Sequence, residues 1–167
     1  MAGKSTAARP SLDVKAHILI IESRYYEAVA DALLEGALAE LKASGATYDK
    51  ILVPGALEIP QALAQAVAAG LIPADAAGSR YDGAIVLGCV IRGETSHYDI
   101  VCNNANHWLM DVAIRANVPL GNAILTVDTE AQALARAKGG RNGKGADAVR
   151  ACLSLVQISR AFEEVDT

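Results

Sequence analysis

Four short apolar runs alternate with longer amphipathic segments along this chain of 167 residues. The runs are continuous and rich in β-branched residues, which is typical of strands covered on both faces, and they lie at residues 16–22, 50–53, 83–87 and 119–125. Apolar residues recur at helical spacing between and after these runs, which predicts helices over residues 26–43, 59–69, 96–116, from 129 onward and 146–162. Because strands and helices alternate, we predict an α/β fold, a three-layer α/β/α sandwich with a four-stranded parallel sheet in a flavodoxin-like arrangement.

A single domain accounts for residues 14–167, since no linker, internal repeat or low-complexity tract interrupts the alternation. Residues 1–13 show no periodicity and are predicted to form a flexible N-terminal arm. The alternative is that this arm adds a strand to the sheet of a neighbouring subunit. Gly45 follows the first predicted helix and suits the left-handed conformation that ends many helices.

Composition and charge exclude several classes of partner. The net charge is -4, which argues against nucleic acid as the main partner because phosphate backbones attract basic surfaces. No apolar run approaches the roughly 18 residues that a membrane span needs. The first ten residues lack the apolar core of a signal peptide, so we expect a cytoplasmic protein that does not bind membranes.

The cysteines and histidines do not form a metal-binding pattern. Cys89, Cys102 and Cys152 are odd in number and lack CxxC spacing, so we interpret them as small buried apolar residues. No pair of histidines has the spacing of metal ligands. We expect His17, at the start of a strand, to be structural and His107, beside Trp108 in the middle of a predicted helix, to be solvated or satisfied.

Candidate chemistry gathers where the predicted strands end, because ligands of open α/β sheets bind at the carboxyl ends of the strands. The loops at these ends are residues 23–26, 54–58, 89–97 and 126–128. Neither GxxxxGK[ST] nor GxGxxG follows a strand. The third loop combines Gly93, the hydroxyls of Thr95 and Ser96, and a predicted helix start, which together suit an anion. We therefore predict that this loop binds a phosphorylated small molecule and that His97 transfers protons there.

Each candidate also has a structural interpretation. His97 could be a structural residue near a helix start, and Tyr25 could cover the core instead of stacking on a flat ring. Glu58 could cap its own helix instead of binding a ligand hydroxyl. From the residues alone, Arg136 is best interpreted as a solvated helix charge, although arginine could also complete a phosphate site.

Three motifs carry a resemblance to a known family. They are VPGALEIP at residues 53–60, GCVIRGETSHYD at residues 88–99 and ILT at residues 124–126. The chain resembles 6,7-dimethyl-8-ribityllumazine synthases from about residue 18 to residue 162. The resemblance implies condensation of 5-amino-6-(D-ribitylamino)uracil with 3,4-dihydroxy-2-butanone 4-phosphate to form the lumazine, phosphate and water, the penultimate step of riboflavin biosynthesis. It implies no metal and no organic cofactor.

The resemblance also implies roles for individual residues. The uracil and its ribityl chain would be held by Tyr25, by Ala56, Leu57 and Glu58, and by the backbone of Cys89, Val90 and Ile91. The phosphate would be held by Glu94, Thr95 and Arg136, and His97 would transfer protons, so the resemblance reverses the solvated interpretation of Arg136. Lys144 matches a further family lysine near the substrate.

Three positions depart from the family pattern. Leu57 replaces a usual phenylalanine, and Cys89 replaces a threonine or alanine. Asn122 stands where many members place an aromatic ring from a neighbouring subunit, which leaves the second half of the stacking arrangement in question.

Family members form homopentamers with active sites shared between neighbours, and some build icosahedral sixty-subunit shells. Residues 136–144 are not visibly lengthened, so the pentamer and the shell both remain open. Three other functions also remain open: an archaeal-type riboflavin synthase that condenses two lumazines, a flavin- or lumazine-binding module without turnover, and a storage shell without catalysis.

Overall fold

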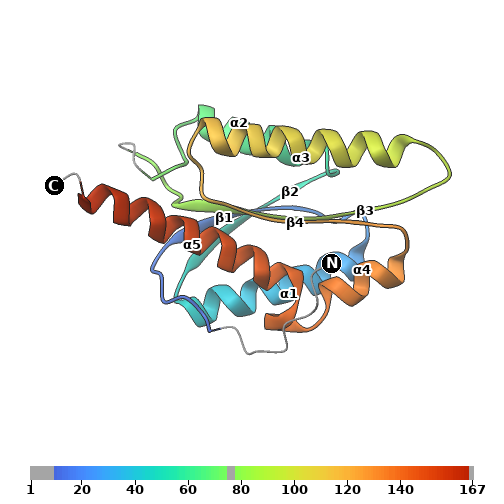
Figure 1. The fold of residues 1–167 in the computed structure, drawn as a ribbon, viewed down its shortest axis with the longest axis horizontal. Coiled ribbons are helices and arrows are strands. Elements are labelled where there is room, and N and C mark those ends of the chain that lie inside the picture. Colours follow the sequence, from blue (N-terminus) through green and yellow to red (C-terminus); the bar gives the residue numbers. More distant parts are fainter. Residues whose placement is uncertain (1–9, 75–77, 166–167) are drawn as a thin grey trace.

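Four strands and five α-helices alternate in the computed structural model, which describes residues 10–74 and 78–165 (Figure 1). The elements are β1 (His17–Ser23), α1 (Glu27–Ser44), β2 (Thr47–Val53), α2 (Glu58–Ala68), β3 (Gly83–Ile91), α3 (His97–Arg115), β4 (Leu120–Val127), α4 (Glu130–Ala137), the 3-10 turn η1 (Gly140–Asn142) and α5 (Lys144–Val165). The predicted α/β architecture is confirmed.

The sheet has the order β2-β1-β3-β4, and every neighbouring pair is parallel. The carboxyl ends of all four strands therefore lie along one edge of the sheet. The chain leaves β1 toward β2 on one side and later returns to β3 on the other, so the order reverses between β1 and β3. In open α/β sheets such a reversal creates a crevice at the carboxyl edge.

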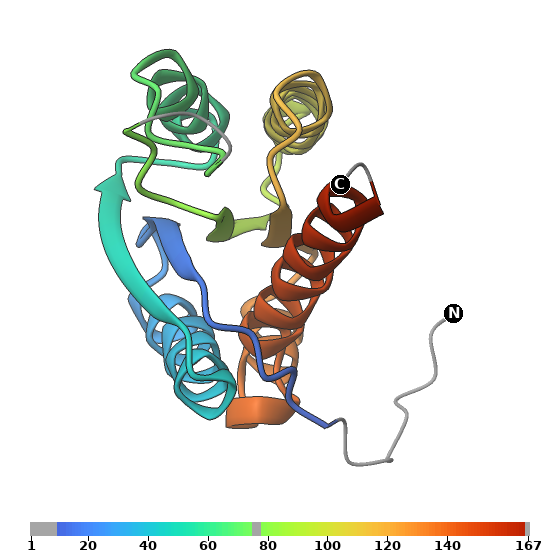
Figure 2. The same cartoon turned by 90° about the vertical axis from the view of Figure 1, so that its left-hand side faces the viewer.

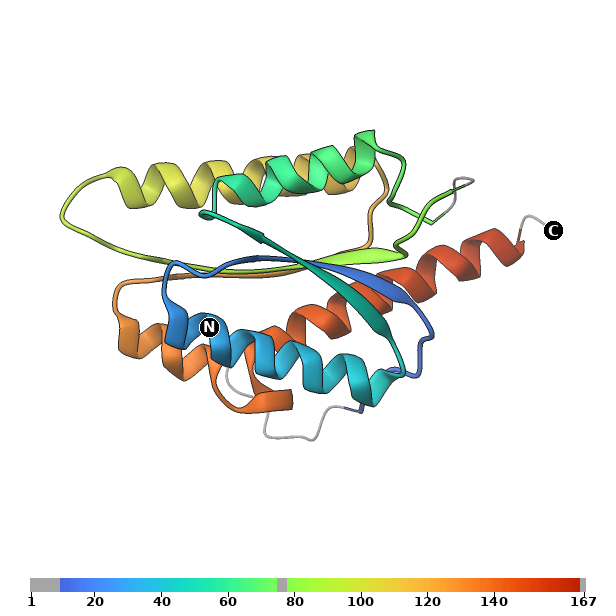
Figure 3. The ribbon, with the colours of Figure 1, turned by 180° about the vertical axis from the view of Figure 1, so that it is seen from behind.

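Helices cover both faces of the sheet, as Figure 2 shows. One face is covered by α2 and α3, and the opposite face by α1, α4 and α5. Alternate residues of each strand enter the two cores; Ile18 and Ile20 pack toward α1, whereas Leu19 and Ile21 pack toward α2. β2 forms an exposed edge of the sheet (Figure 3).

Several predicted boundaries are wrong, and long-range pairing explains the main one. β3 continues to Ile91 because residues 89–91 pair with residues 125–127 of β4. These residues therefore belong to a strand and not to the loop. β2 begins three residues earlier than predicted, at Thr47, because it pairs with β1 from His17. Trp108 shares the helical spacing of the apolar residues of α3, but its side chain is 52% exposed.

The helix ends follow the local sequence. Gly45 has a φ of 72° after α1, which confirms its predicted left-handed conformation. α3 begins at His97, and the Thr95 hydroxyl accepts a hydrogen bond from the backbone N–H of His97 at 3.3 Å. α5 begins at Lys144, earlier than predicted, because the glycine-rich segment before it closes into η1.

The predicted N-terminal arm is described only from Pro10. Residues 1–9, and with them most of the alternative added strand, lie outside the described residues. Residues 10–13 have no regular structure, and Ser11 donates a hydrogen bond to Glu40 at 2.7 Å. No helix in the described part of the chain is long and apolar enough to cross a membrane.

Candidate active site

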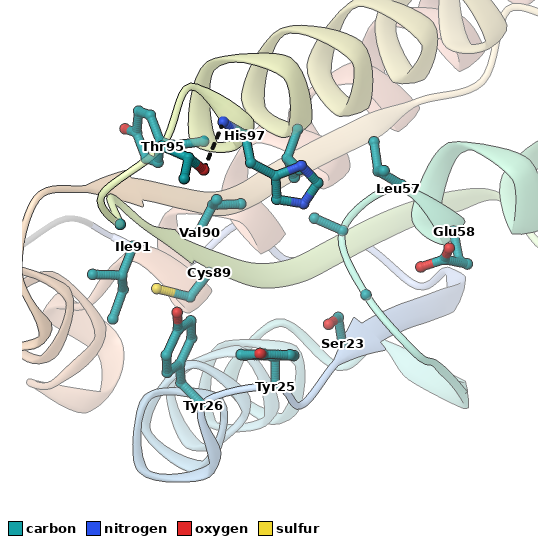
Figure 4. Close-up of a pocket in the computed structure, with 15 residues that line it drawn as sticks. Ser23, Tyr25, Tyr26, Leu57, Glu58, Cys89, Val90, Ile91, Thr95 and His97 are labelled. Atoms are coloured by element: carbon teal, nitrogen blue, oxygen red, sulfur yellow. Dashed lines mark hydrogen bonds between the residues drawn. The ribbon is translucent and has the colours of Figure 1, made fainter.

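A cavity of about 310 Å³ opens at the carboxyl edge of the sheet, where the strand order reverses between β1 and β3 (Figure 4). Its volume lies at the lower end of the range of small-molecule pockets. Three segments that are distant in sequence line it: the loop after β1, the loop between β2 and α2, and the end of β3 with the start of α3.

The loop after β1 contributes two aromatic rings. Tyr25 is 75% exposed, an unusual exposure for a large aromatic side chain. Tyr26 packs edge-on against it, with ring centroids 5.0 Å apart. Burial, followed by the neighbouring Cys89, raises the pKa of Tyr26, so its hydroxyl remains protonated near neutral pH. An exposed ring beside a cavity can stack on a flat ligand.

The loop between β2 and α2 contributes Ala56, Leu57 and Glu58. Glu58 is the first residue of α2, and no protein group in the described ranges hydrogen-bonds to its carboxylate. This favours the interpretation that Glu58 binds a ligand over the interpretation that it caps its helix. A carboxylate of this kind accepts hydrogen bonds from ligand hydroxyls.

The end of β3 forms the floor of the cavity through Cys89, Val90 and Ile91. Cys89, Cys102 and Cys152 are free cysteines; Cys102 and Cys152 are buried as predicted, but the prediction is wrong for Cys89, which is only partly buried because it lines the cavity. Burial, with a smaller contribution from the charge of Glu130, raises the pKa of Cys89 to about 11. Its thiol is therefore protonated at neutral pH and is a poor nucleophile.

The segment after β3 contributes Gly93, Thr95, His97 and Tyr98. A Cβ atom at Gly93 would meet no atom within 4 Å beyond its chain neighbours, so this lining position is uncrowded. Figure 4 shows His97 and Tyr25 on opposite sides of the cavity. The His97 ring has no hydrogen-bond partner among the described residues, so it is free to exchange protons with a ligand.

The cavity unites nine of the predicted site residues: Tyr25, Ala56, Leu57, Glu58, Cys89, Val90, Ile91, Thr95 and His97. Three others lie outside it. Glu94 is exposed in the same loop, and Asn122 lies on β4, where its side-chain amide donates a hydrogen bond to Asn106 at 2.8 Å. Arg136 is exposed on α4 and donates a hydrogen bond to the backbone oxygen of Gln132, at 3.0 Å.

The cavity also has lining residues to which the sequence assigned no individual role. They are Ser23, Tyr26, Gly55, Tyr98 and Val101. Ser23 and Tyr26 lie directly after β1, so the carboxyl-edge rule locates their loop without identifying which side chains point inward. Tyr98 and Val101 lie one helical turn apart on α3, and Tyr98 belongs to the GCVIRGETSHYD motif. Val101 follows His97 by four residues, so helical spacing was the signal that could have found it.

The other two histidines lie outside the cavity. His17 stacks on Tyr81 with ring centroids 5.3 Å apart, and its ring is hydrogen-bonded to Thr47 and Asp49. His107 is exposed beside Trp108. No group of three or more potential metal ligands occurs within residues 10–74 and 78–165.

The fold and cavity define a class of α/β protein that binds a small molecule at the carboxyl edge of a parallel sheet. Residues 15–160 match the sequence model of a family described as 6,7-dimethyl-8-ribityllumazine synthase. The chain belongs to this family.

Curated relatives extend the match over most of the chain. It is 54% identical over 145 residues to 6,7-dimethyl-8-ribityllumazine synthase 1 of Rhodopseudomonas palustris, covering 87% of this chain and 86% of the relative. The enzymes of Agrobacterium fabrum and Azorhizobium caulinodans are 51% and 53% identical to it. Each comparison covers 87% of this chain, and 96% and 87% of those relatives, respectively.

Proposed function

We propose that this chain condenses 5-amino-6-(D-ribitylamino)uracil with 3,4-dihydroxy-2-butanone 4-phosphate to form 6,7-dimethyl-8-ribityllumazine, phosphate and water. The observation that carries the proposal is the cavity in which two of the family motifs, VPGALEIP and GCVIRGETSHYD, meet the aromatic loop after β1. The cavity combines an exposed aromatic ring, an unpaired carboxylate, a strand backbone and a free imidazole. These groups suit a flat, hydroxylated substrate and a reaction that needs repeated proton transfer.

The pyrimidine substrate occupies the floor of the cavity in this proposal. Tyr25 stacks on its ring, and the backbone of residues 89–91 hydrogen-bonds to its edge. Glu58, together with the backbone of residues 56–57, binds the hydroxyls of the ribityl chain. Leu57 in place of the usual phenylalanine leaves these backbone contacts unchanged.

The butanone phosphate binds at the start of α3. Thr95 offers a hydroxyl, and the backbone at Glu94 and Thr95 lies at the positive end of the helix, where N–H groups lack helical partners. The phosphate is thereby placed beside the ring of His97.

The reaction then needs proton transfer at each stage. The 5-amino group attacks the butanone carbonyl, and water leaves to give an imine. Elimination of phosphate produces an enol, which becomes a ketone, and attack by the ribitylamino nitrogen closes the second ring with loss of water. His97 transfers protons in these steps. Much of the rate comes from holding both substrates together.

We further propose that neighbouring subunits complete each site in a homopentamer, alone or within a sixty-subunit shell. Arg136 and Asn122 lie outside the cavity of their own chain, which supports their contribution to a neighbour's cavity. α3 also exposes large apolar side chains: Ile100, Trp108, Met110 and Ile114. Apolar exposure of this kind marks surfaces that bind other proteins. Lys144 would reach the site in the same way.

The proposed place of action is the cytoplasm. The three cysteines are free, and a reducing compartment keeps free thiols from pairing.

The experiment that tests the activity mixes both substrates with the purified chain and follows lumazine absorbance, with light scattering to measure assembly size. Lumazine formation supports the proposal. Binding without turnover would identify a binding module or a storage shell. Consumption of lumazine without any need for the phosphate substrate would identify a riboflavin synthase.

Mixing of variants tests the shared site. We expect Arg136→Ala to raise the KM for the butanone phosphate and His97→Ala to lower turnover. Co-assembly of the two variants should restore part of the activity, because some sites then combine an intact His97 with an intact Arg136 from the neighbour. Activity equal to the average of the two separate variants would contradict a shared site.

A further inference from the structure

Arg92 lies in the segment that the proposed function assigns to phosphate, yet its guanidinium is already engaged. Its Nε donates to a carboxylate oxygen of Asp128 at 3.0 Å, and its Nη1 lies 3.5 Å from a carboxylate oxygen of Asp99. The guanidinium carbon lies 4.1 Å from the centre of the Tyr98 ring. Two edges and one face of the group are therefore occupied by protein.

One of these contacts links the two ends of the segment that carries the proposed phosphate-binding groups. Arg92 and Asp99 flank residues 93–98, so their ion pair ties the two ends of that segment together. The segment contains Gly93, where a Cβ would meet nothing within 4 Å, so packing at that position does not restrain it. The ion pair at its ends is therefore one of the interactions that restrain it.

Asp128 connects the same segment to the neighbouring loop. The backbone N–H of Arg92 donates to the Val127 oxygen at 2.9 Å, and Asp128 directly follows β4. The backbone N–H of Asp128 in turn donates to the side chain of Gln132 on α4 at 2.9 Å. The guanidinium thus joins the loop after β3 to the loop after β4.

Charge balance argues against direct phosphate binding by Arg92. One guanidinium faces two carboxylates, Asp99 and Asp128, so the cluster carries no net positive charge. Ile91 and Gly93 line the cavity on either side of Arg92, whereas Arg92 does not line it. We propose that Arg92 is a positioning residue whose clamp to Asp99 and Asp128 holds Thr95, His97 and Tyr98 at the cavity, and that it does not itself bind the substrate phosphate.

The kinetic test of this clamp rests on the proposed function, because it measures lumazine formation. It compares Arg92→Gln, Asp128→Asn and the double variant in the assembled enzyme. Each single variant should raise the KM for the butanone phosphate on the order of tenfold, because small displacements of binding groups are costly. The KM for the ribitylaminouracil should stay close to the wild-type value. The double variant should be no worse than either single variant, since both break one clamp.

Opposite responses of the two single variants would overturn the proposal. If Arg92 bound phosphate directly, Asp128→Asn would remove a competing negative charge and would lower that KM or leave it unchanged. Unchanged KM values in both variants, or additive effects in the double variant, would also overturn it. Arg115→Gln is the matched control, since Arg115 also donates through Nε to an aspartate on α3, at 2.7 Å, but at the far end of the helix.

Hydrogen exchange separates failure of the clamp from failure of the proposed function. Exposed ion pairs contribute little to overall stability, so the thermal midpoint should not change. Amide exchange across residues 93–98 should become faster in Arg92→Gln and Asp128→Asn, and remain unchanged in Arg115→Gln. Unchanged exchange in all three would overturn the clamp even if the wild-type chain forms no lumazine. Faster exchange in an inactive chain would support the clamp while the proposed function failed.

Discussion

The two helical layers that cover the sheet are built differently. On the face covered by α1, α4 and α5, glycines bring backbones into direct contact: a Cβ at Gly121 would lie 1.8 Å from the Ala148 oxygen, and one at Gly145 would lie 2.0 Å from the Leu33 oxygen. On the face covered by α2 and α3, a Cβ at Gly88 would first meet the flexible end of Ile59, at 3.3 Å. The first face is therefore close-packed through backbone, whereas the second is packed through side chains.

The charged and titratable side chains on the two sides also differ in whether they hydrogen-bond to protein. Glu40 is fully buried on α1, and its carboxylate accepts hydrogen bonds from Ser11, Arg141 and Arg150 at 2.7, 2.9 and 2.8 Å. Glu58 and His97, on the cavity side, have no side-chain hydrogen bond to protein within the described ranges. The charge of Glu40 helps to hold the chain together, whereas Glu58 and His97 remain available for a ligand. This comparison teaches that buried charge supports the packing against α5, while the groups at the carboxyl edge of the sheet are left for binding.

Gly121→Ala should have the largest effect on stability. The new Cβ would collide with the backbone of α5 at Ala148, and backbone cannot move aside as a flexible side chain can. We expect a destabilisation of at least about 4 kcal/mol, or failure to fold. Thermal unfolding at fixed protein concentration measures it.

Gly93→Ala is the matched control on the cavity side. Open space surrounds this position, so the substitution should change the free energy of unfolding by no more than about 0.5 kcal/mol. Equal losses of stability in Gly121→Ala and Gly93→Ala would contradict the proposed difference in packing.

Local sequence signals predicted the positions of the strands and of the loops that line the cavity. The apolar runs at residues 16–22 and 83–87 contain the centres of β1 and β3, because strands buried on both faces need continuous apolar residues. The carboxyl-edge rule then located the three loops that line the cavity. These inferences needed only local pattern and topology.

The remainder depends on contacts that are distant in sequence. Residues 89–91 continue β3 only because β4 pairs with them. The partners Glu40 and Arg150 are 110 residues apart, so no local pattern reveals them. Trp108 fits helical apolar spacing, yet it lies at the margin of the buried face of α3 and stays 52% exposed. Spacing gives the face of a helix but not how far its neighbours extend over it.

Glu40→Gln should have the next largest effect. The substitution removes the charge that compensates Arg150, whose side chain is only 13% exposed, and breaking one partner of a buried pair costs about 3–5 kcal/mol. Glu35→Gln is the control, since Glu35 is exposed on the same helix. Urea unfolding of both variants at pH 7 compares them, and equal midpoints would contradict a stabilising role for the buried charge.

Acid should remove the same contribution from the wild-type chain. Burial raises the pKa of Glu40, but the hydrogen bonds from Ser11 and Arg141 and the charges of Arg150 and Arg141 outweigh it, and the net pKa is lowered. A lowered pKa in the folded state adds stability that is fully present above the unfolded value of about 4.3. That stability is lost as the pH falls through the folded pKa. The stability difference between wild type and Glu40→Gln should therefore shrink below pH 4; a constant difference would contradict this.

His97→Ala should affect turnover and leave folding unchanged. The imidazole has no hydrogen-bond partner among the described residues. Alanine would keep the backbone hydrogen bond of residue 97 to Thr95, so the substitution breaks no hydrogen bond in this part of the chain. We expect a loss of about 100-fold in kcat, the usual contribution of a proton-transfer group. Residual activity should remain because substrate positioning is intact. Complete loss of activity with intact assembly would show that His97 does more than transfer protons.

Trp108→Ala should have only a small effect on the stability of the chain itself. Its neighbour Leu109 is fully buried against the sheet, so Leu109→Ala should cost about 2–5 kcal/mol, whereas Trp108 is half exposed and should cost no more than about 1 kcal/mol. Because Trp108 lies on the exposed apolar side of α3, its removal should instead weaken assembly, which light scattering over a dilution series measures. Two adjacent residues of one helix would then separate folding from association. A large loss of chain stability with unchanged assembly would mean that the outer side of α3 belongs to the core, and the difference between the two faces would be smaller than their packing indicates.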